Sequence, residues 1–283
     1  MAILLIVNQE YFIILIRKNK FFMKLSGRGW GGTIVGKLLC RVIVLLMNPI
    51  KIDGIKLYLD YTDGIDHIIR PYKKYQIKCC LDNISPNDVV VDIGANIGHF
   101  ATVASKVGKA GHVFCFEASP HNCKLIKKNI KANNIDNISV ENKAVSNLSG
   151  FLKLYLYRET KYHRLYPTNG HQKFINVSAI KLDDFELPNK IDFIKIDVVG
   201  SEAKVIEGMR GIINNNPNLK IVMEFSAYRV NESGGSIDEM FHILESANFR
   251  IYDIDTSTQR LVSLDSETIS KSNKTHYLLL KKS

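Results

Sequence analysis

The sequence is poor in the residues that hold disulfide scaffolds and zinc modules together. It has 5 cysteines in 283 residues, and no two of them form a CxxC pair. An odd number of cysteines at irregular spacing indicates neither a disulfide framework nor a zinc site, and it is typical of an intracellular protein. The chain also has no internal repeat and no low-complexity tract, which argues against a solenoid or a disordered linker protein.

Acidic residues are missing from one long segment, because none lies between Glu10 and Asp53. Its apolar runs, residues 3–7, 11–16 and 34–47, are shorter than the roughly 20 residues of a spanning helix. No basic region precedes the first run, as a signal peptide would require. A helix on an anionic membrane surface and a helix packed on the rest of the chain are both compatible with this pattern. The basic residues of the segment are Arg17, Lys18, Lys20, Lys24, Arg28, Lys37, Arg41 and Lys51.

These observations predict two parts. Residues 1–83 form a basic, apolar appendage with helical or hairpin lead-in structure, and residues 84–283 form the main domain. Met23 offers an alternative start for a shorter chain. We expect a cytoplasmic protein, with any membrane contact peripheral, at the inner face and through the N-terminus. The oligomeric state stays open.

The most informative segment begins with the β-branched run Val89–Val91, which ends in Asp92 and a turn containing Gly94 and Gly98. Such a run suits a strand buried on both faces. Glycines let the backbone bend tightly beneath a ligand before a helix restarts over residues 100–107. The pattern is typical of a pocket for a nucleotide cofactor.

The spacing of that turn distinguishes between cofactors. A dinucleotide site needs glycine at the first, third and sixth positions, which here hold Gly94, Asn96 and His99. Asp92 would also repel a pyrophosphate. S-adenosylmethionine has no phosphate, but it has an ammonium group and a ribose diol that carboxylates can bind. A second apolar run, residues 112–116, ends in Glu117, which is positioned to accept both ribose hydroxyls.

The rest of the chain alternates between expected strands and helices, which predicts an α/β, Rossmann-like, doubly wound sheet with a terminal antiparallel strand. Ser119–Pro120 is a helix start, and Ser236 with Glu239 forms a capping box. We expect helices over residues 119–133, 202–213 and 236–247, and further strands over residues 138–145, 151–157, 174–182, 191–198, 220–225, 249–255, 260–264 and 275–282.

Five motifs in order resemble those of FkbM-type S-adenosylmethionine-dependent methyltransferases, over roughly residues 50–283. They are Asp92–Gly98, Phe116–Pro120, Asn142–Val145, Leu182–Asp184 and Ile194–Glu202. The resemblance implies a class I methyltransferase fold, S-adenosylmethionine as methyl donor, and usually a hydroxyl oxygen as acceptor, often on a sugar or a secondary metabolite. With the motifs, it predicts a cofactor site formed by Asp92, Gly94, Ala95, Asn96, Gly98, Glu117, Ala118, Asn142, Ala144 and Asp197.

The candidate catalytic residues are carboxylates near the ends of expected parallel strands, where ligands of such sheets bind. Methyl transfer to a hydroxyl requires the acceptor oxygen to be positioned and its proton removed. Asp197 is the first candidate for this role, followed by Glu224 and Glu202. Lys195 precedes Asp197 by two residues, so both should share a face of the strand, where the lysine can tune the carboxylate by charge. No pair of histidines has metal-ligand spacing, so we predict no metal site.

An expected insertion between residues 157 and 174 carries Tyr162, His163, Arg164, Tyr166 and Pro167, and we interpret it as an element that faces the acceptor. These side chains could bind a sugar or could merely cover the sheet. The predicted partner is therefore a saccharide or another small molecule.

One position departs from the family pattern. Where the family most often has Asp-x-Glu-Gly, this chain has Val199 between Asp197 and Gly200. Val199 could only pack, or its presence could reduce or retarget activity. A methyltransferase-fold scaffold without turnover is thus one alternative.

RNA methylation is the other alternative, because the net charge is +10 and phosphate neutralisation drives nucleic-acid binding. A stripe of lysines at helical spacing contributes to that charge, but no RNA-binding module or aromatic platform accompanies it. The stripe consists of Lys124, Lys127, Lys128 and Lys131.

Overall fold

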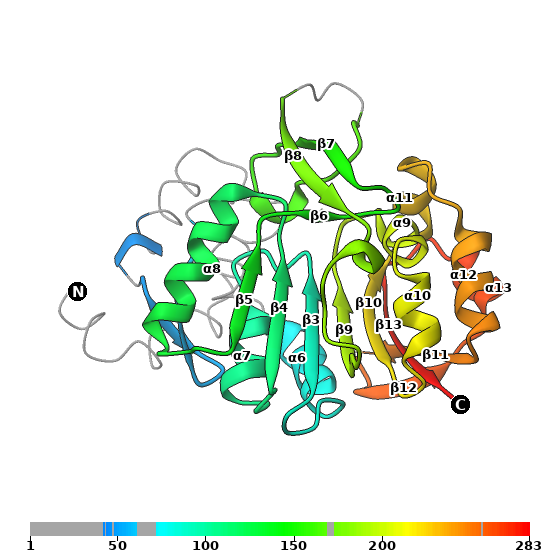
Figure 1. Ribbon diagram of the computed structural model, residues 1–283, viewed down its shortest axis with the longest axis horizontal. Helices are drawn as coiled ribbons and strands as arrows, with labels where there is room; N and C mark the ends of the chain where they lie inside the picture. Colours follow the sequence, from blue (N-terminus) through cyan, green and yellow to red (C-terminus); the bar gives the residue numbers. More distant parts are fainter. Residues whose placement is uncertain (1–41, 43, 47, 61–71, 169–172, 256) are drawn as a thin grey trace.

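The computed structural model describes the chain except for residues 1–41, 43, 47, 61–71, 169–172 and 256. The N-terminal apolar runs and His171 therefore lie outside the described residues, apart from a few positions between 42 and 46. An eight-stranded sheet forms the centre of the molecule (Figure 1). From edge to edge its strands are β12 (Arg260–Ser263), β11 (Phe249–Asp255), β13 (His276–Lys282), β10 (Lys220–Phe225), β9 (Phe193–Ile196), β3 (Val89–Ile93), β4 (His112–Phe116) and β5 (Ile138–Glu141).

The sheet is parallel in one half and antiparallel in the other. Strands β10, β9, β3, β4 and β5 pair in parallel, whereas β13 runs antiparallel between β10 and β11. The chain moves outward in one direction from β3 and then returns to β9 on its other side. Strand order thus reverses between β3 and β9, which is where a doubly wound sheet binds its ligand. The predicted Rossmann-like sheet with an antiparallel strand near its end is confirmed.

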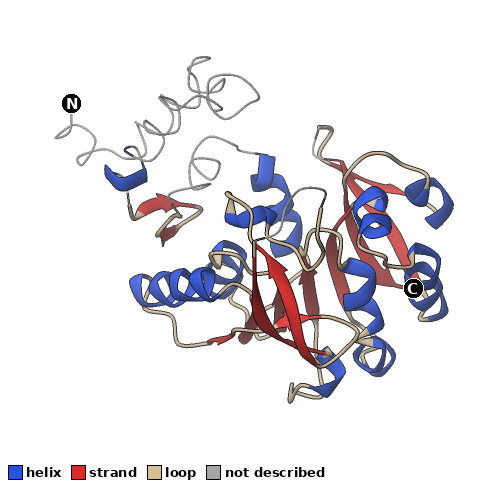
Figure 2. Ribbon diagram, turned by 90° about the horizontal axis from the view of Figure 1, so that it is seen from above, coloured by secondary structure: helices blue, strands red, loops and turns tan. Residues whose placement is uncertain are grey.

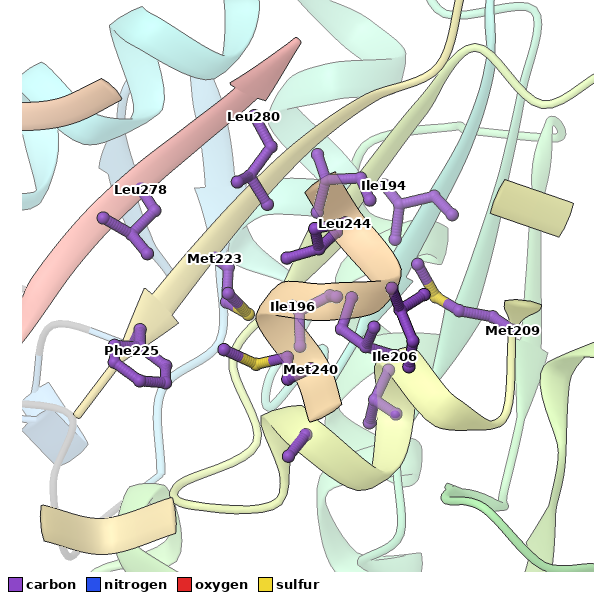
Figure 3. Close-up of a cluster of buried hydrophobic side chains, with 14 of the residues drawn as sticks. Ile194, Ile196, Ile206, Met209, Met223, Phe225, Met240, Leu244, Leu278 and Leu280 are labelled. Atoms are coloured by element: carbon purple, nitrogen blue, oxygen red, sulfur yellow. The ribbon is translucent and has the colours of Figure 1, made fainter. Parts of the chain in front are cut away.

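Helices cover both faces of the sheet because its strands bury alternate side chains on opposite sides. Residues of α6 (Tyr72–Leu81), α7 (His99–Lys106) and α8 (Pro120–Ala132) pack with Val90, Val113 and Val222. On the other face, α9 (Glu202–Glu207), α10 (Arg210–Asn215) and α12 (Ile237–Ser246) pack against the strands. That core contains Met209, Met240 and Leu244 over Ile196 and Met223 (Figure 3).

Several element boundaries differ from those the sequence predicts. The expected strand over residues 138–145 is two strands, because β5 ends at Glu141 and β6 (Ala144–Val145) joins another sheet. The expected helix over residues 202–213 is divided into α9 and α10 around Gly208. A Cβ at Gly208 would lie 2.0 Å from the carbonyl oxygen of Ser146, so the chain passes another segment too closely for a larger residue there. The helix α6 was not predicted.

A smaller sheet lies at the carboxyl ends of the parallel strands. It consists of β6, β8 (Phe174–Ile180) and β7 (Gly150–Tyr155) in that order. β7 and β8 are the predicted antiparallel pair, and the chain between them contains the expected insertion. In the view from above, this sheet lies in front of the large one (Figure 2). The short elements η2 (Thr160–Tyr162), η3 (Leu182–Asp184), α11 (Ala227–Glu232) and α13 (Ser266–Ser270) complete the described structure after residue 84.

An N-terminal hairpin packs on α7 and α8. Its strands β1 (Ile50–Ile52) and β2 (Ile55–Leu57) bury Ile50, Ile55 and Leu57 with residues of those helices. Asn129 of α8 and Asn133, the C-cap of that helix, hold the hairpin by hydrogen bonds to backbone. Asn129 accepts from the N–H of Tyr58 at 2.6 Å and donates to its carbonyl at 3.3 Å, and Asn133 makes the same pair of bonds to Lys56 at 2.8 and 2.6 Å. Among the described residues, no helix is long and apolar enough to cross a membrane. The division at residue 83 stays a prediction.

Candidate active site

A cavity of about 280 Å³ opens at the carboxyl ends of β3, β4, β9 and β10, where the strand order reverses. It is lined on one side by the turn after β3 and on another by the insertion after β7. Of the predicted site residues, it brings together Gly94, Ala95, Asn96, Glu117, Ala118, Ala144, Lys195, Asp197 and Glu224. These residues come from five separate segments of the chain, so the fold gathers most of the predicted site.

The turn after β3 requires glycine for two reasons. Gly94 has φ +75°, which side-chain-bearing residues adopt at a cost, and a Cβ there would lie 2.1 Å from the carbonyl oxygen of Asp197. The backbone N–H groups of Gly94 and Ala95 both donate to the carbonyl oxygen of Phe116, at 2.9 and 3.1 Å. The turn is thus fixed between the ends of β4 and β9. Gly98 lies outside the cavity lining. It is the N-cap of α7 and has φ +77°.

Glu117 is held by the backbone around it. One carboxylate oxygen accepts from the N–H of Asn96 at 2.8 Å, and the other accepts from the N–H of Ser119 at 2.8 Å. Burial raises the pKa of Glu117 to about 7, although these hydrogen bonds oppose the shift. Each oxygen of this carboxylate keeps lone-pair capacity beyond its backbone hydrogen bond, and the predicted contact with the ribose diol stays a prediction.

A buried lysine links two predicted site carboxylates. The Lys195 ammonium lies 3.1 Å from Asp92 and 3.5 Å from Asp197, because Lys195 is paired with Asp92 across β3 and β9. Burial lowers the pKa of Lys195, but the two carboxylates outweigh burial and raise it overall, so the lysine is charged. Asp92 has no exposed surface and is not part of the cavity lining. Its predicted contact with the cofactor stays a prediction, and its observed partner is Lys195.

Glu224 lies at the end of β10 with both oxygens near a partner. Tyr277 donates its hydroxyl to one oxygen, and the guanidinium of Arg229 lies 3.6 Å from the other. Glu224 and Asp197 thus line the same cavity from β10 and from the loop after β9. The structure places both in one cavity, whereas the sequence could only rank them as candidates, and their catalytic role stays a prediction.

Two predicted residues, Glu202 and Asn142, lie outside the cavity lining and hold the backbone next to it. Glu202 is 2% exposed, lies outside the lining, and accepts from the N–H of Gly200 at 2.9 Å. Burial raises the pKa of Glu202 to about 8. Asn142 also lies outside the lining and donates its amide to the carbonyls of Glu117 and Ala118 at 2.9 and 3.0 Å. Both side chains fix the backbone next to the cavity.

The insertion supplies one wall of the cavity, as expected from its polar side chains. Residues 160–165 line it, and His163 accepts from the N–H of Tyr157 at 3.1 Å through Nδ1, which places the ring proton on Nε2. Tyr166 lies behind this wall with a hydroxyl 3.3 Å from Arg164. The cavity also contains side chains that the sequence motifs did not reveal, namely Gln76, Cys80, Phe100, Asn122, Lys161, Arg229 and Tyr277.

Val199 adopts a backbone conformation that its side chain disfavours. It has φ +50°, and β-branched residues are rarely found there. Gly200 follows with φ +90°, and a Cβ there would lie 2.7 Å from both the carbonyl oxygen of Arg229 and the hydroxyl of Tyr166. The loop is therefore held in a strained form by its neighbours, with Val199 on the cavity wall.

The cavity fits an adenosine-bearing cation. Asn96 and Asn122 line it, and their side-chain oxygens are buried and have no hydrogen-bond partner within the described part of the chain. Each oxygen can accept a bond from an amine or hydroxyl of a ligand. Glu117 and Asp197 add negative charge, and no cradle of backbone N–H groups for a pyrophosphate accompanies them in the turn after β3. Fold and cavity together define a class I methyltransferase that uses S-adenosylmethionine.

Comparison with known proteins agrees with this class. Residues 92–251 match the family model of the Methyltransferase FkbM domain. A relative named Methyltransferase 1, from Beauveria bassiana, is 23% identical over 164 residues, which cover 49% of this chain and 66% of that protein. The matched region thus spans just under two thirds of the relative. Because the family model matches more than half of the chain, the chain belongs to the FkbM methyltransferase family.

Two solved structures illustrate the similarity of this chain to known proteins. The FkbM methyltransferase of Methylobacillus flagellatus KT has a TM-score of 0.45 and 16% identity, with coverage of 89% of this chain and 60% of that one. TYW2 of M. jannaschii, solved in complex with AdoMet, has a TM-score of 0.44 and 16% identity, with 81% of each chain covered.

Proposed function

We propose that this methyltransferase transfers the methyl group to a hydroxyl oxygen of a saccharide or another small metabolite. The observation that carries the proposal is the position of Asp197. Its carboxylate lines the cavity at the end of β9, beside the charged Lys195 and across from the insertion. S-adenosylmethionine supplies an electrophilic methyl group on sulfur, so the protein must orient a nucleophilic oxygen and take up its proton.

Asp197 and Glu224 have complementary parts in this proposal. Asp197 accepts the hydroxyl proton, and the ammonium of Lys195 lies 3.5 Å from that carboxylate and orients it. Glu224, fixed by Tyr277, hydrogen-bonds a second hydroxyl of the acceptor and orients it. Two carboxylates with fixed partners on one cavity wall suit a polyol, because vicinal hydroxyls can donate to both.

The insertion supports a small acceptor. Its residues Thr160 to Leu165 close one side of the cavity and include the half-exposed ring of Tyr162, whose apolar face suits the C–H face of a sugar ring. The volume of about 280 Å³ lies just below the range of about 300 to 1,000 Å³ for small-molecule sites, which supports a compact acceptor.

The experiment uses S-adenosylmethionine with a labelled methyl group and a panel of glycosides and hydroxylated metabolites. We expect Asp197→Asn to lower kcat by about 100-fold or more, the range of a lost general base. Binding of S-adenosylmethionine, measured by calorimetry, should change by only a few fold. Asp238→Asn, an exposed carboxylate in the first turn of α12, is the matched control.

Three results separate this proposal from its alternatives. Absence of S-adenosylmethionine binding would contradict an enzyme of this class. Binding without transfer to any member of the panel would favour the scaffold interpretation attached to Val199. Full activity of Asp197→Asn on a methylated hydroxyl would remove Asp197 from the role of base.

A further inference from the structure

Two arginines line the cavity from elements that meet beside it. Arg164 belongs to the insertion after β7, and Arg229 belongs to α11. Arg164 lies 3.7 Å from Glu232, which is one helical turn beyond Arg229. The two arginines therefore line one cavity, Arg164 from the insertion and Arg229 from α11.

Arg164 is held rigidly. Its guanidinium lies 4.6 Å from the ring centre of Tyr157 and 5.3 Å from that of Tyr166. Its backbone pairs with Tyr155 through two hydrogen bonds, of 2.8 and 3.3 Å, at an isolated β-bridge. The side chain is only 13% exposed, so little conformational entropy remains to be lost when a ligand binds.

The guanidinium of Arg229 has N–H donors that can bind a ligand. It contacts the Glu224 carboxylate at 3.6 Å, which is beyond hydrogen-bond distance, and its guanidinium makes no hydrogen bond to any described residue. Its side chain is 30% exposed at the cavity wall. A guanidinium has five N–H donors arranged to bind carboxylate or phosphate oxygens in pairs.

We propose that Arg164 and Arg229 bind an anionic group on the methyl acceptor, so that the substrate class is an acidic hydroxylated compound. This inference rests on the proposed function, because it names the acceptor of the same site. A carboxylate, as in a uronic acid, and a phosphate, as in a sugar phosphate, share the required chemistry. A neutral sugar would offer no charge to either guanidinium, whose only acidic partners among the described residues are Glu224 for Arg229 and Glu232 for Arg164.

The test measures binding rather than turnover, with the protein loaded with S-adenosylhomocysteine. Methyl β-D-glucuronoside, glucose 1-phosphate and methyl β-D-glucoside are titrated by calorimetry at constant ionic strength. We expect at least one anionic probe to bind at least tenfold more tightly than the neutral glucoside. The stronger of the two anions identifies carboxylate or phosphate as the source of the charge.

Arg164→Gln and Arg229→Gln should each reduce that preference at least tenfold. Arg229 is the more exposed of the two, so its variant keeps the test valid if Arg164→Gln unfolds. Arg164→Lys should retain part of the preference, because it keeps charge without the planar fork. Arg210→Gln is the matched control, since Arg210 is also paired with a glutamate, Glu239, but lies outside the cavity.

Equal affinity for all three probes, or no binding of any of them, overturns the proposal. A preference that survives in both arginine variants also overturns it. The proposed function fails by a different result, namely the absence of S-adenosylhomocysteine and S-adenosylmethionine binding, so the two failures are distinguishable.

Discussion

Glu202 is a carboxyl group that the folded chain keeps almost entirely from water. Burial raises its pKa to about 8, from the ordinary value of 4.5, so the folded state retains a proton that the unfolded state releases. Its contribution to stability is therefore complete below about pH 4.5 and is lost as the pH rises to about 8. Its hydrogen bond from Gly200 orders the loop that carries Val199.

We expect Glu202→Gln to remove this pH dependence, because glutamine can still accept from Gly200 but cannot ionise. The free energy of unfolding of the wild type, relative to the variant, should fall between about pH 4.5 and 8. Urea unfolding at several pH values measures the difference. Parallel curves for the two proteins would contradict the assignment.

Gly94 combines a left-handed conformation with a close approach to another strand end, and a control elsewhere in the chain separates the two effects. Gly54 has nearly the same φ, +79°, but a Cβ there would meet only a side-chain atom at 3.6 Å. We expect both Gly→Ala variants to lose about 1 kcal/mol from backbone strain. Gly94→Ala should lose about 2 kcal/mol more from the contact with Asp197 and should weaken S-adenosylmethionine binding. Equal losses in urea unfolding would mean that the close approach carries no cost.

Among the elements, α8 joins the N-terminal hairpin to the domain, and Asn129 is one of the side chains that make this connection. Asn129 also donates to the carbonyl of Ile97 at 2.8 Å, so one side chain makes three hydrogen bonds to backbone. We expect Asn129→Ala to lower the free energy of unfolding by about 3 kcal/mol, at about 1 kcal/mol for each bond. Hydrogen exchange at residues 55–59 should also accelerate. Lys131→Ala, an exposed residue of the same helix, should change neither quantity.

The parts of the fold that sequence predicts well are those with a strong local signal. The apolar strands 89–93, 112–116 and 220–225 and the N-caps Ser119 and Ser236 all occur as expected. The helix α6 was missed because its 10 residues include three lysines and two cysteines, so its sequence shows no clear apolar face at helical spacing. The division of the helix after Glu202 was missed because it depends on a contact of Gly208 with a distant segment.

In the site, as in the fold, the residues that could be predicted are those that belong to local sequence motifs. Residues in motifs at strand ends, such as Glu117 and Asp197, lie in the cavity because strand ends converge there. Arg229 and Tyr277 carry no local pattern, and only the pairing of β10 with β13 brings Tyr277 to Glu224. Asp92 was expected against the ligand, but the Lys195 side chain from the adjacent strand takes up its charge.

For the molecule as a whole, the net charge of +10 leads to an expectation about RNA. The lysine stripe of α8 is exposed, and Lys128 lies over the ring of Tyr58 at 3.7 Å. Contact of four lysines with phosphates would make RNA affinity fall roughly 50-fold between about 50 and 200 mM salt. We expect such weak, salt-dependent filter binding without methyl incorporation. Changing the four lysines of the stripe to glutamine should remove the salt dependence and leave S-adenosylmethionine binding unchanged.

Labelled methyl groups in RNA would contradict this expectation and favour RNA as the acceptor. The readout is independent of the glycoside panel, so one protein preparation can be assayed for both acceptor classes. The affinity of the wild-type chain for RNA should be highest at low salt, because the screening of surface charges is then weakest.

The contact between Gly94 and the Asp197 carbonyl joins the donor side of the cavity to the acceptor side through two stretches of backbone. Because the two stretches lie so close together, we expect a shift of one to move the other, so that occupancy of one side changes the free energy of occupying the other. Thermodynamic linkage makes this effect reciprocal: a donor that tightens acceptor binding by some factor is itself retained more tightly by the same factor. After transfer, the methylated product and S-adenosylhomocysteine occupy the two sides, and we expect release of either one to weaken the binding of the other.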